Sequence, residues 1–102
     1  SAIGLDDSPG QVIKASAGLL FGWHIKNTTA AALYVQVFNK AALADVTLGT
    51  TVPDFTIGIP SLGDSGLSLS VGIVMSAGIT VFSTTTVGGL TGAASDCTFY
   101  YA

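Results

Sequence analysis

The sequence predicts an all-β fold, and three observations support this prediction. Apolar residues recur at every second position in several short runs, which is the period of a strand with one buried face. Gly, Pro, Asn and Ser residues separate these runs and are typical of turns. Neither Glu nor Arg occurs, so the long charged side chains that favour helices are nearly absent. Together these observations predict a single β-sandwich, jelly-roll-like or Greek-key, with seven or eight antiparallel strands.

The clearest strand spans residues 55–59, where Phe55, Ile57 and Ile59 fall on one face. Pro53 precedes this run and Pro60 follows it. Because proline lacks a backbone N–H donor, it suits the ends of a strand and the edge of a sheet. We therefore expect a short strand with defined ends near a sheet edge.

Six further runs are expected to form strands. They cover residues 11–16, 19–27, 33–40, 67–72, 79–84 and 97–101. Residues 61–66 are expected to form a loop, and residues 73–75 to carry the chain across to the opposite sheet. Residues 86–95 contain three glycines and are expected to form a flexible loop.

The candidate core anchors are large apolar side chains of these alternating runs: Phe21, Trp23, Phe55, Ile57 and Phe99. In strict alternation Phe21 and Trp23 fall on the same face, and we expect the indole N–H of Trp23 to find a hydrogen-bond partner. Cys97 and Phe99 also share a face of the last run. The single cysteine is therefore expected to be a buried, inert thiol.

The composition indicates one domain that associates with other proteins. The chain has 102 residues and a mass of 10.2 kDa, which suits a single domain. Charged residues make up only 9% of it, against roughly 25% in ordinary globular domains. A surface so poor in charge tends to associate. We divide the chain into an N-terminal arm and turn, residues 1–10, which could be loose or exchanged with a neighbour, and a sandwich domain, residues 11–102.

Several functional classes find no support in the sequence. A net charge of −3 without a basic cluster argues against nucleic-acid binding, and no apolar run approaches the ~20 residues of a membrane-spanning helix. No signal peptide is visible at the start. His24 has no second ligand at metal-binding spacing, and the Asp residues lack the spacing of a calcium loop, although converging loops could still offer them to calcium. No catalytic triad can be assigned from one His, so we expect no enzyme activity, no cofactor and no metal.

Four motifs carry a resemblance to a known group of proteins. They are Ser-Ala-Gly-Leu-Leu-Phe-Gly-Trp at residues 16–23, Asn-Thr-Thr-Ala-Ala at 27–31, Tyr-Val-Gln-Val-Phe-Asn at 34–39 and Leu-Gly-Thr-Thr-Val-Pro at 48–53. In this order they resemble small virion-associated proteins of tailed bacteriophages and prophages. The likeness covers roughly residues 12–101. One departure is Leu33, where many relatives would have a basic residue, and it argues against a charge-mediated contact by this strand.

The resemblance implies a structural role as a capsid decoration (cement) protein that binds and stabilises the phage head shell in many copies. The expected partners are the major capsid protein of the same particle and further copies of the chain, as a homo-oligomer and by analogy a trimer. The expected location is the head surface of the virion, after synthesis in the cytoplasm of the host bacterium. The candidate interface residues are Ile3, Leu5, Tyr34 and Phe38.

The alternative function is a carbohydrate- or receptor-binding module of a phage fibre or head spike. Such a module would present Trp23, Tyr34, Tyr100 or Tyr101 as exposed stacking platforms. Exposure separates the two functions. Buried aromatic residues favour the structural protein, and an open aromatic shelf favours the binding module.

Overall fold

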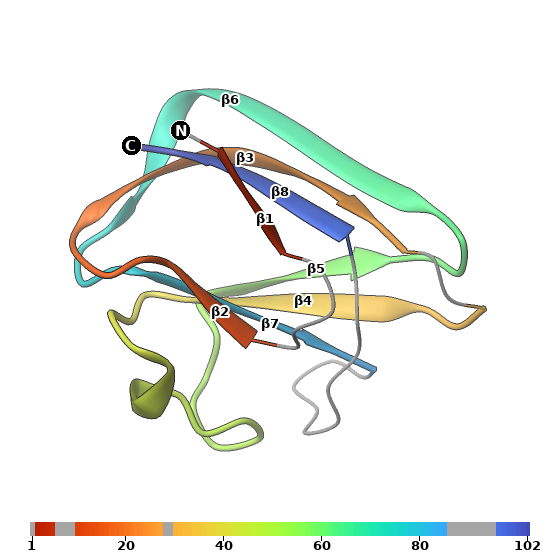
Figure 1. Ribbon diagram of the computed structural model, residues 1–102, viewed down its shortest axis with the longest axis horizontal. Helices are drawn as coiled ribbons and strands as arrows, with labels where there is room; N and C mark the ends of the chain where they lie inside the picture. Colours follow the sequence, from red (N-terminus) through yellow and green to blue (C-terminus); the bar gives the residue numbers. More distant parts are fainter. Residues whose placement is uncertain (1, 6–9, 28–29, 86–95) are drawn as a thin grey trace.

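The computed structural model describes residues 2–5, 10–27, 30–85 and 96–102, and for residues 2–5 and 96 it describes the backbone alone. The described strands form two four-stranded antiparallel sheets that pack face to face (Figure 1). They are β1 (Ala2–Leu5), β2 (Gly10–Lys14), β3 (Gly18–Lys26), β4 (Leu33–Phe38), β5 (Phe55–Ile59), β6 (Asp64–Met75), β7 (Ile79–Thr84) and β8 (Asp96–Tyr101). A short 3-10 helix, η1 (Leu43–Asp45), lies between β4 and β5.

The strand order is that of a jelly roll. The first sheet has the order β1-β8-β3-β6 and the second sheet has the order β2-β7-β4-β5. β1 pairs with β8, β2 with β7, β3 with β6 and β4 with β5. The first half of the chain therefore pairs with the second half, as in one long hairpin rolled up on itself. The predicted all-β sandwich is confirmed.

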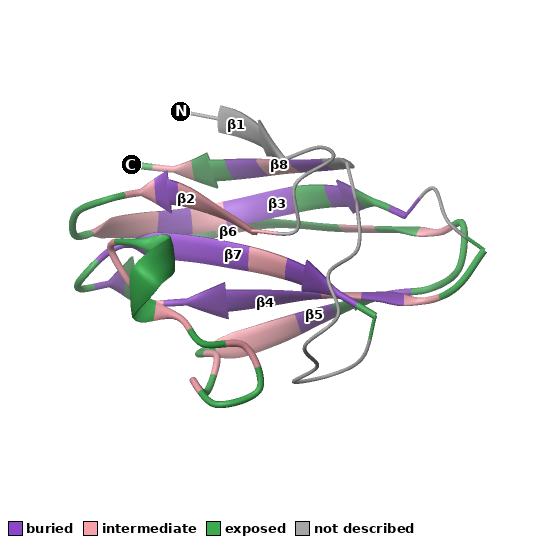
Figure 2. Ribbon diagram, turned by 60° about the horizontal axis from the view of Figure 1, so that its bottom comes forward, coloured by how far each residue is buried: buried purple, intermediate pink, exposed green. Residues whose placement is uncertain are grey.

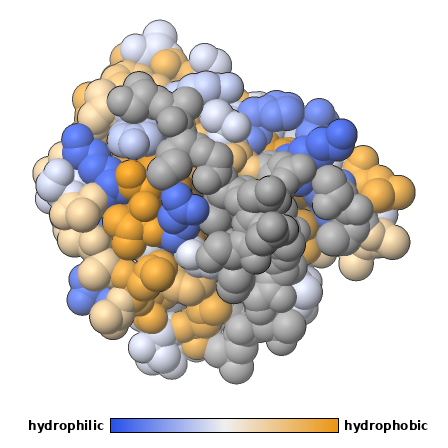
Figure 3. Space-filling view, viewed as in Figure 1, coloured by the Kyte–Doolittle hydropathy of each residue, from blue (hydrophilic) through white to orange (hydrophobic). Residues whose placement is uncertain are grey.

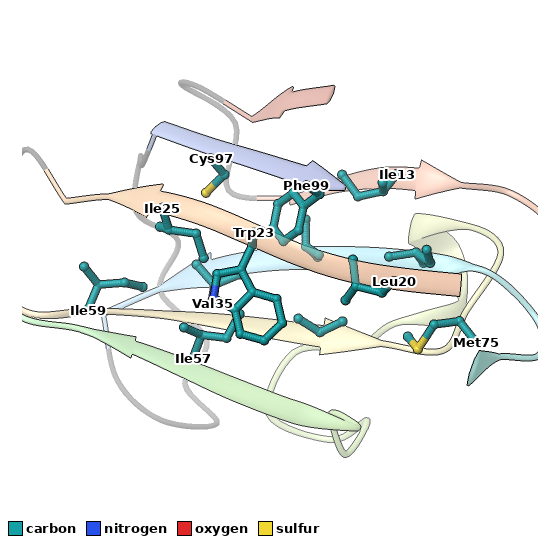
Figure 4. Packing of buried hydrophobic residues seen from close by; sticks show 13 residues of the cluster. Ile13, Leu20, Trp23, Ile25, Val35, Ile57, Ile59, Met75, Cys97 and Phe99 are labelled. Carbon is teal, nitrogen blue, oxygen red and sulfur yellow. The ribbon is translucent and has the colours of Figure 1, made fainter. Parts of the chain in front are cut away.

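The interior between the two sheets is apolar and receives side chains from both (Figure 4). Trp23 of β3 reaches across to the second sheet and packs on Phe55 of β5, with 5.6 Å between the ring centroids. Ile57 and Phe99 belong to the same buried cluster, and the free thiol of Cys97 is buried beside them. The full cluster is Ile13, Leu20, Trp23, Ile25, Val35, Val37, Ile57, Ile59, Met75, Ile79, Val81, Cys97 and Phe99.

One core anchor is in a different environment from the expected one. The indole Nε1 of Trp23 is buried but has no hydrogen-bond partner among the described residues. Figure 4 shows this nitrogen among aliphatic side chains, near Val35. The apolar packing of the large ring therefore outweighs the cost of one unpaired donor.

The prediction for residues 61–75 is wrong in two respects. Residues 64–75 form one continuous strand, where a loop had been expected at residues 61–66. This strand stays in the first sheet, and residues 73–75 do not cross to the second sheet, because Ile73 pairs with Leu20 of β3. The Ser and Gly residues here have weak strand propensity, and long-range pairing with β3 overrides it.

The expected place of Phe21 in the core is also wrong. The buried cluster contains Leu20 and Trp23 but not Phe21. The pairing of β3 is irregular between Leu20 and Gly22, so the alternation shifts there and Phe21 turns away from the interior. A bulge therefore reverses the face that strict alternation would assign.

The N-terminal segment is part of the first sheet. Ala2 pairs with Tyr100 and Leu5 pairs with Cys97 of the same chain. The structure thus shows neither a loose arm nor an exchanged strand over these residues. The expected flexible loop at residues 86–95 lies outside the described residues.

Candidate interaction surface

Four strands lie at sheet edges: β1 and β6 in the first sheet, β2 and β5 in the second. An edge strand leaves the backbone N–H and C=O groups of one side without a strand partner, so it can accept a strand from another chain. β6 is the longest of the four, with 12 residues. Among the described strands it pairs with β3 alone.

We call residues 65–75 the β6 edge. This segment contains no charged residue and no proline. Its exposed apolar side chains are Leu67, Val71 and Val74, with exposed fractions of 41%, 79% and 73%. Figure 2 shows β6 largely in the colours of exposed and intermediate residues. The β6 edge thus lacks the charges and prolines that natural proteins use to keep edge strands apart.

The middle of β6 bulges away from β3. Gly22 pairs with Ser68 and Leu20 pairs with Ile73, so residues 69–72 lie opposite the single residue Phe21. Figure 1 shows β6 bending along its length. Gly22 permits the irregularity because its φ is 156°, and a Cβ at this position would collide with the backbone oxygen of Leu67. The bulge leaves Val71 exposed to solvent.

The outer face of the first sheet continues this apolar surface. Val74 pairs with Leu19, and the ring of Phe21 lies over Gly72. Tyr100 of β8 pairs with Gly22 and is 42% exposed. We call Leu19, Phe21, Val74 and Tyr100 the outer-face patch. Figure 3 shows a face of the molecule on which strongly hydrophilic residues form only small clusters between apolar and weakly polar ones.

β5 is an edge of a different kind. It has five residues and lies between Pro53 and Pro60, which cannot donate a backbone hydrogen bond. Phe55, its first residue, packs on Trp23 at the margin of the core. Just before the strand, the backbone N–H of Asp54 donates to the carbonyl oxygen of Val37 at 2.8 Å. The position of this strand at a sheet edge agrees with the sequence prediction.

Asn27 fixes the turn that joins these two edge strands. Its buried side-chain Nδ2 donates to the carbonyl oxygens of Ala31 at 2.7 Å and Pro60 at 3.0 Å. Its backbone N–H donates to the carbonyl oxygen of Gly63 at 2.9 Å. The sequence indicated only a turn at Asn27, because an Asn after a strand does not show which distant carbonyls it will reach.

The structure does not bring the four candidate interface residues together. Ile3 and Leu5 lie on β1, whose side chains are outside the described part of the chain. Tyr34 is half-buried on the second sheet, beside Gly58. Phe38 is only 1% exposed and packs edge-to-face on Phe82, with 5.9 Å between the ring centroids. Phe38 is therefore removed from the candidate interface.

The face of β4 that carries Phe38 is covered along most of its length. Gln36 shares this face of β4, and its side-chain Nε2 donates to the hydroxyl of buried Thr84 at 2.9 Å. The second sheet is thus covered on this face as well as on the face toward the core. Apolar residues on both faces of residues 33–38 indicated a contact with a partner, but they pack within the chain.

The aromatic residues that a glycan-binding module would expose are largely covered. Trp23 is 8% exposed, and Tyr34 and Tyr101 are half-buried. Tyr100 is the one large aromatic side chain that the structure shows as exposed among the described residues. No shelf of exposed aromatic rings is therefore found in this part of the chain.

The described residues contain no group of three or more His, Cys, Asp and Glu side chains that could hold a metal ion. The Nε2 atom of His24 lies 3.7 Å from Oδ2 of Asp64, and both side chains are mostly exposed. Within the same residues, no helix has the length and apolar character needed to span a membrane.

Comparison of the chain with protein-family models, with curated proteins and with solved structures found no match. Proposals about its function therefore depend on its fold, its surface and the resemblance of its motifs.

Proposed function

We propose that the chain is a structural virion protein of a tailed bacteriophage, a capsid decoration (cement) protein that binds and stabilises the head shell in many copies. The observation that carries this proposal is the β6 edge, which is long, uncharged and apolar. Such an edge can hold proteins together by main-chain hydrogen bonds and apolar contacts.

The fold adds support by analogy only. Jelly rolls occur in viral capsid domains, and they also occur in lectins. A shared fold does not establish a shared function, so the surface has to decide between these uses. The burial of Trp23 and the half-burial of Tyr34 and Tyr101 favour the structural role.

The proposed partners are the major capsid protein of the same particle and further copies of the chain. A trimer of the chain would suit the three-fold positions of an icosahedral shell. The corresponding location is the head surface of the virion, after synthesis in the host cytoplasm. Residues 2–5 already pair with β8, so a contact through the N-terminal segment would use the free side of β1.

Attachment should depend little on ion pairs. The chain has three Lys and six acidic residues, and exposed pairs contribute only about 0 to 1 kcal/mol each. Apolar contacts and backbone hydrogen bonds should dominate instead. Binding to the shell should therefore tolerate high salt.

One observation favours the alternative function, a carbohydrate- or receptor-binding module of a phage fibre or head spike. Tyr100 is exposed opposite Gly22 in the first sheet, and an aromatic ring can stack on a sugar. A single exposed ring gives this alternative less support than the β6 edge gives the first.

The test combines purified chain with phage particles that lack it. The bound copies per shell and the melting temperature of the shell are measured at low and at molar salt, and bound particles are imaged to locate the chain. We expect many copies on the head, a higher melting temperature and little release by salt. Binding confined to fibres or tail, or release by moderate salt, would contradict the proposal.

A further inference from the structure

We propose that the β6 edge pairs with the β6 edge of a second copy of this chain, antiparallel across a two-fold axis near Leu67. The first sheets of the two copies then join into one continuous sheet. This inference rests on the proposed function, which includes self-association of the chain. It deepens that function by naming the contact between two copies.

The backbone of β6 is suited to this pairing on one side of its bulge. From Asp64 to Ser68 the strand is in regular register with β3, from Lys26↔Asp64 to Gly22↔Ser68. Its other side faces no described strand. A regular, uncharged edge without proline is the kind that adds a strand from another chain. The bulge at residues 69–72 sets the end of the segment that can pair.

Leu67 is the exposed apolar residue within the regular part of β6, residues 64–68. In an antiparallel pair, residues on the same face lie opposite each other, so an axis at Leu67 places each Leu67 against its own copy. The exposed side chain of Leu67 is thus covered by its own copy, and the pairing ends where the bulge begins.

The charges favour a second copy as the occupant. Self-pairing brings like charges together wherever a charged residue lies near the axis, and residues 65–75 have none. The nearest charge, Asp64, already has Lys26 opposite it in β3 and His24 at 3.7 Å. The two Asp64 residues would lie roughly 20 Å apart, at about 3.4 Å per residue, which exceeds a Debye length of about 8 Å. Nothing in the charge pattern of the described strand opposes the two-fold contact.

Two variants of Leu67 test the contact in purified protein. The same substitutions at Val52, another exposed apolar residue, are the controls. Leu67→Lys would place two lysines opposite each other at the axis. Val52, which is 84% exposed, lies on the loop before β5. Sedimentation equilibrium up to millimolar protein should give an even number of copies for the wild type and for Val52→Lys, either a dimer or a hexamer in which two trimers are joined by the β6 edges. For Leu67→Lys we expect half that number, with a dissociation constant raised at least about 10-fold.

Leu67→Cys tests the same register without adding charge. Opposed residues of an antiparallel pair have Cα atoms about 4.5 to 5.5 Å apart, a distance that a disulfide can bridge. Mild oxidation should convert Leu67→Cys into a covalent dimer at least about 10-fold faster than Val52→Cys, and the wild type, whose Cys97 is buried, should stay uncrosslinked.

These measurements use no phage particles, so their failure is distinct from failure of the proposed function. A wild type that stays monomeric at millimolar concentration would overturn the inference. So would an oligomer that Leu67→Lys leaves intact, or equal crosslinking rates for the two cysteine variants. In the separate shell-binding assay, loss of binding by Leu67→Lys together with a monomeric wild type would show that the β6 edge contacts the capsid protein and that the two-fold contact is wrong.

Discussion

β5 and β6 follow each other along the chain and lie at sheet edges on the same side of the sandwich. Only β5 has features that hinder pairing with another strand. β5 is short, lies between two prolines and packs Phe55 on Trp23. β6 is more than twice as long and exposes Leu67, Val71 and Val74 without a charge among residues 65–75. Flanking prolines and a short length therefore hinder pairing at β5, and β6 has neither feature. This difference is the reason to look for a partner at β6.

Trp23→Ala should have the largest effect on stability, because Trp23 supports the edge strand β5 through its contact with Phe55. Loss of a buried Trp leaves a large cavity, and we expect about 3 to 5 kcal/mol less stability. Urea unfolding of this variant and of Tyr100→Ala, an exposed aromatic control, measures the difference. A loss below about 1 kcal/mol for Trp23→Ala would show that the ring does not anchor β5.

Gly22→Ala should cause the second-largest loss of stability, because it changes the irregular pairing between β3 and the edge strand β6. An added Cβ would meet the backbone oxygen of Leu67, and the φ of 156° is strained for alanine. We expect a loss of about 2 to 3 kcal/mol by thermal or urea unfolding. The control is Gly58→Ala on β5, where the nearest atoms are ring carbons of Tyr34 at 3.6 Å and 3.7 Å. Equal stability of the two variants would contradict the role given to Gly22.

Asn27→Ala should have an intermediate effect, because it releases the turn between the two edges. The carbonyl oxygens of Ala31 and Pro60 would each lose the hydrogen bond from Nδ2 of Asn27, at a cost of about 1 to 2 kcal/mol. Asn39→Ala is the comparison, since the bonds of Asn39 to Ser76 and Ala77 are exposed and should contribute less. The unfolding midpoints of both variants test the order, and a larger loss at Asn39 would reverse our interpretation.

His24→Ala should have the smallest effect. The imidazole and Asp64 are 3.7 Å apart and mostly exposed at the start of β6, so we expect a change within about 0.5 kcal/mol. The same unfolding measurement at low and at molar salt checks it. A loss above about 1 kcal/mol that disappears in molar salt would mean that charge matters at the β6 edge after all.

The sequence predicted β5 better than β6, and the reason is how local their signals are. Pro53, Pro60 and the alternation of Phe55, Ile57 and Ile59 lie within a few residues of each other, so they identify an edge strand without outside information. The strand character of residues 64–66 depends on pairing with residues 24–26 of β3, which local propensity does not contain.

The sequence predicted that the chain has an interaction surface but not where this surface lies. The charge deficit predicted a face that associates, but the positions of the exposed apolar residues depend on two features of the fold. The bulge at Gly22 moves Phe21 outward, and the covered second sheet moves Phe38 inward. Both depend on backbone geometry and on contacts between residues far apart in the chain, so a periodic pattern could not reveal them.

The nested pairing of the jelly roll also bears on how the chain folds. β4 and β5 are the innermost pair and close the shortest loop, whereas β1 and β8 join the two ends of the chain. The entropic cost of loop closure rises with separation, which favours pairing from the inside outward. Sheets rich in such distant contacts fold in milliseconds to seconds. If β4 and β5 pair first, both edges of β6 lack a strand partner until β3 pairs with one of them.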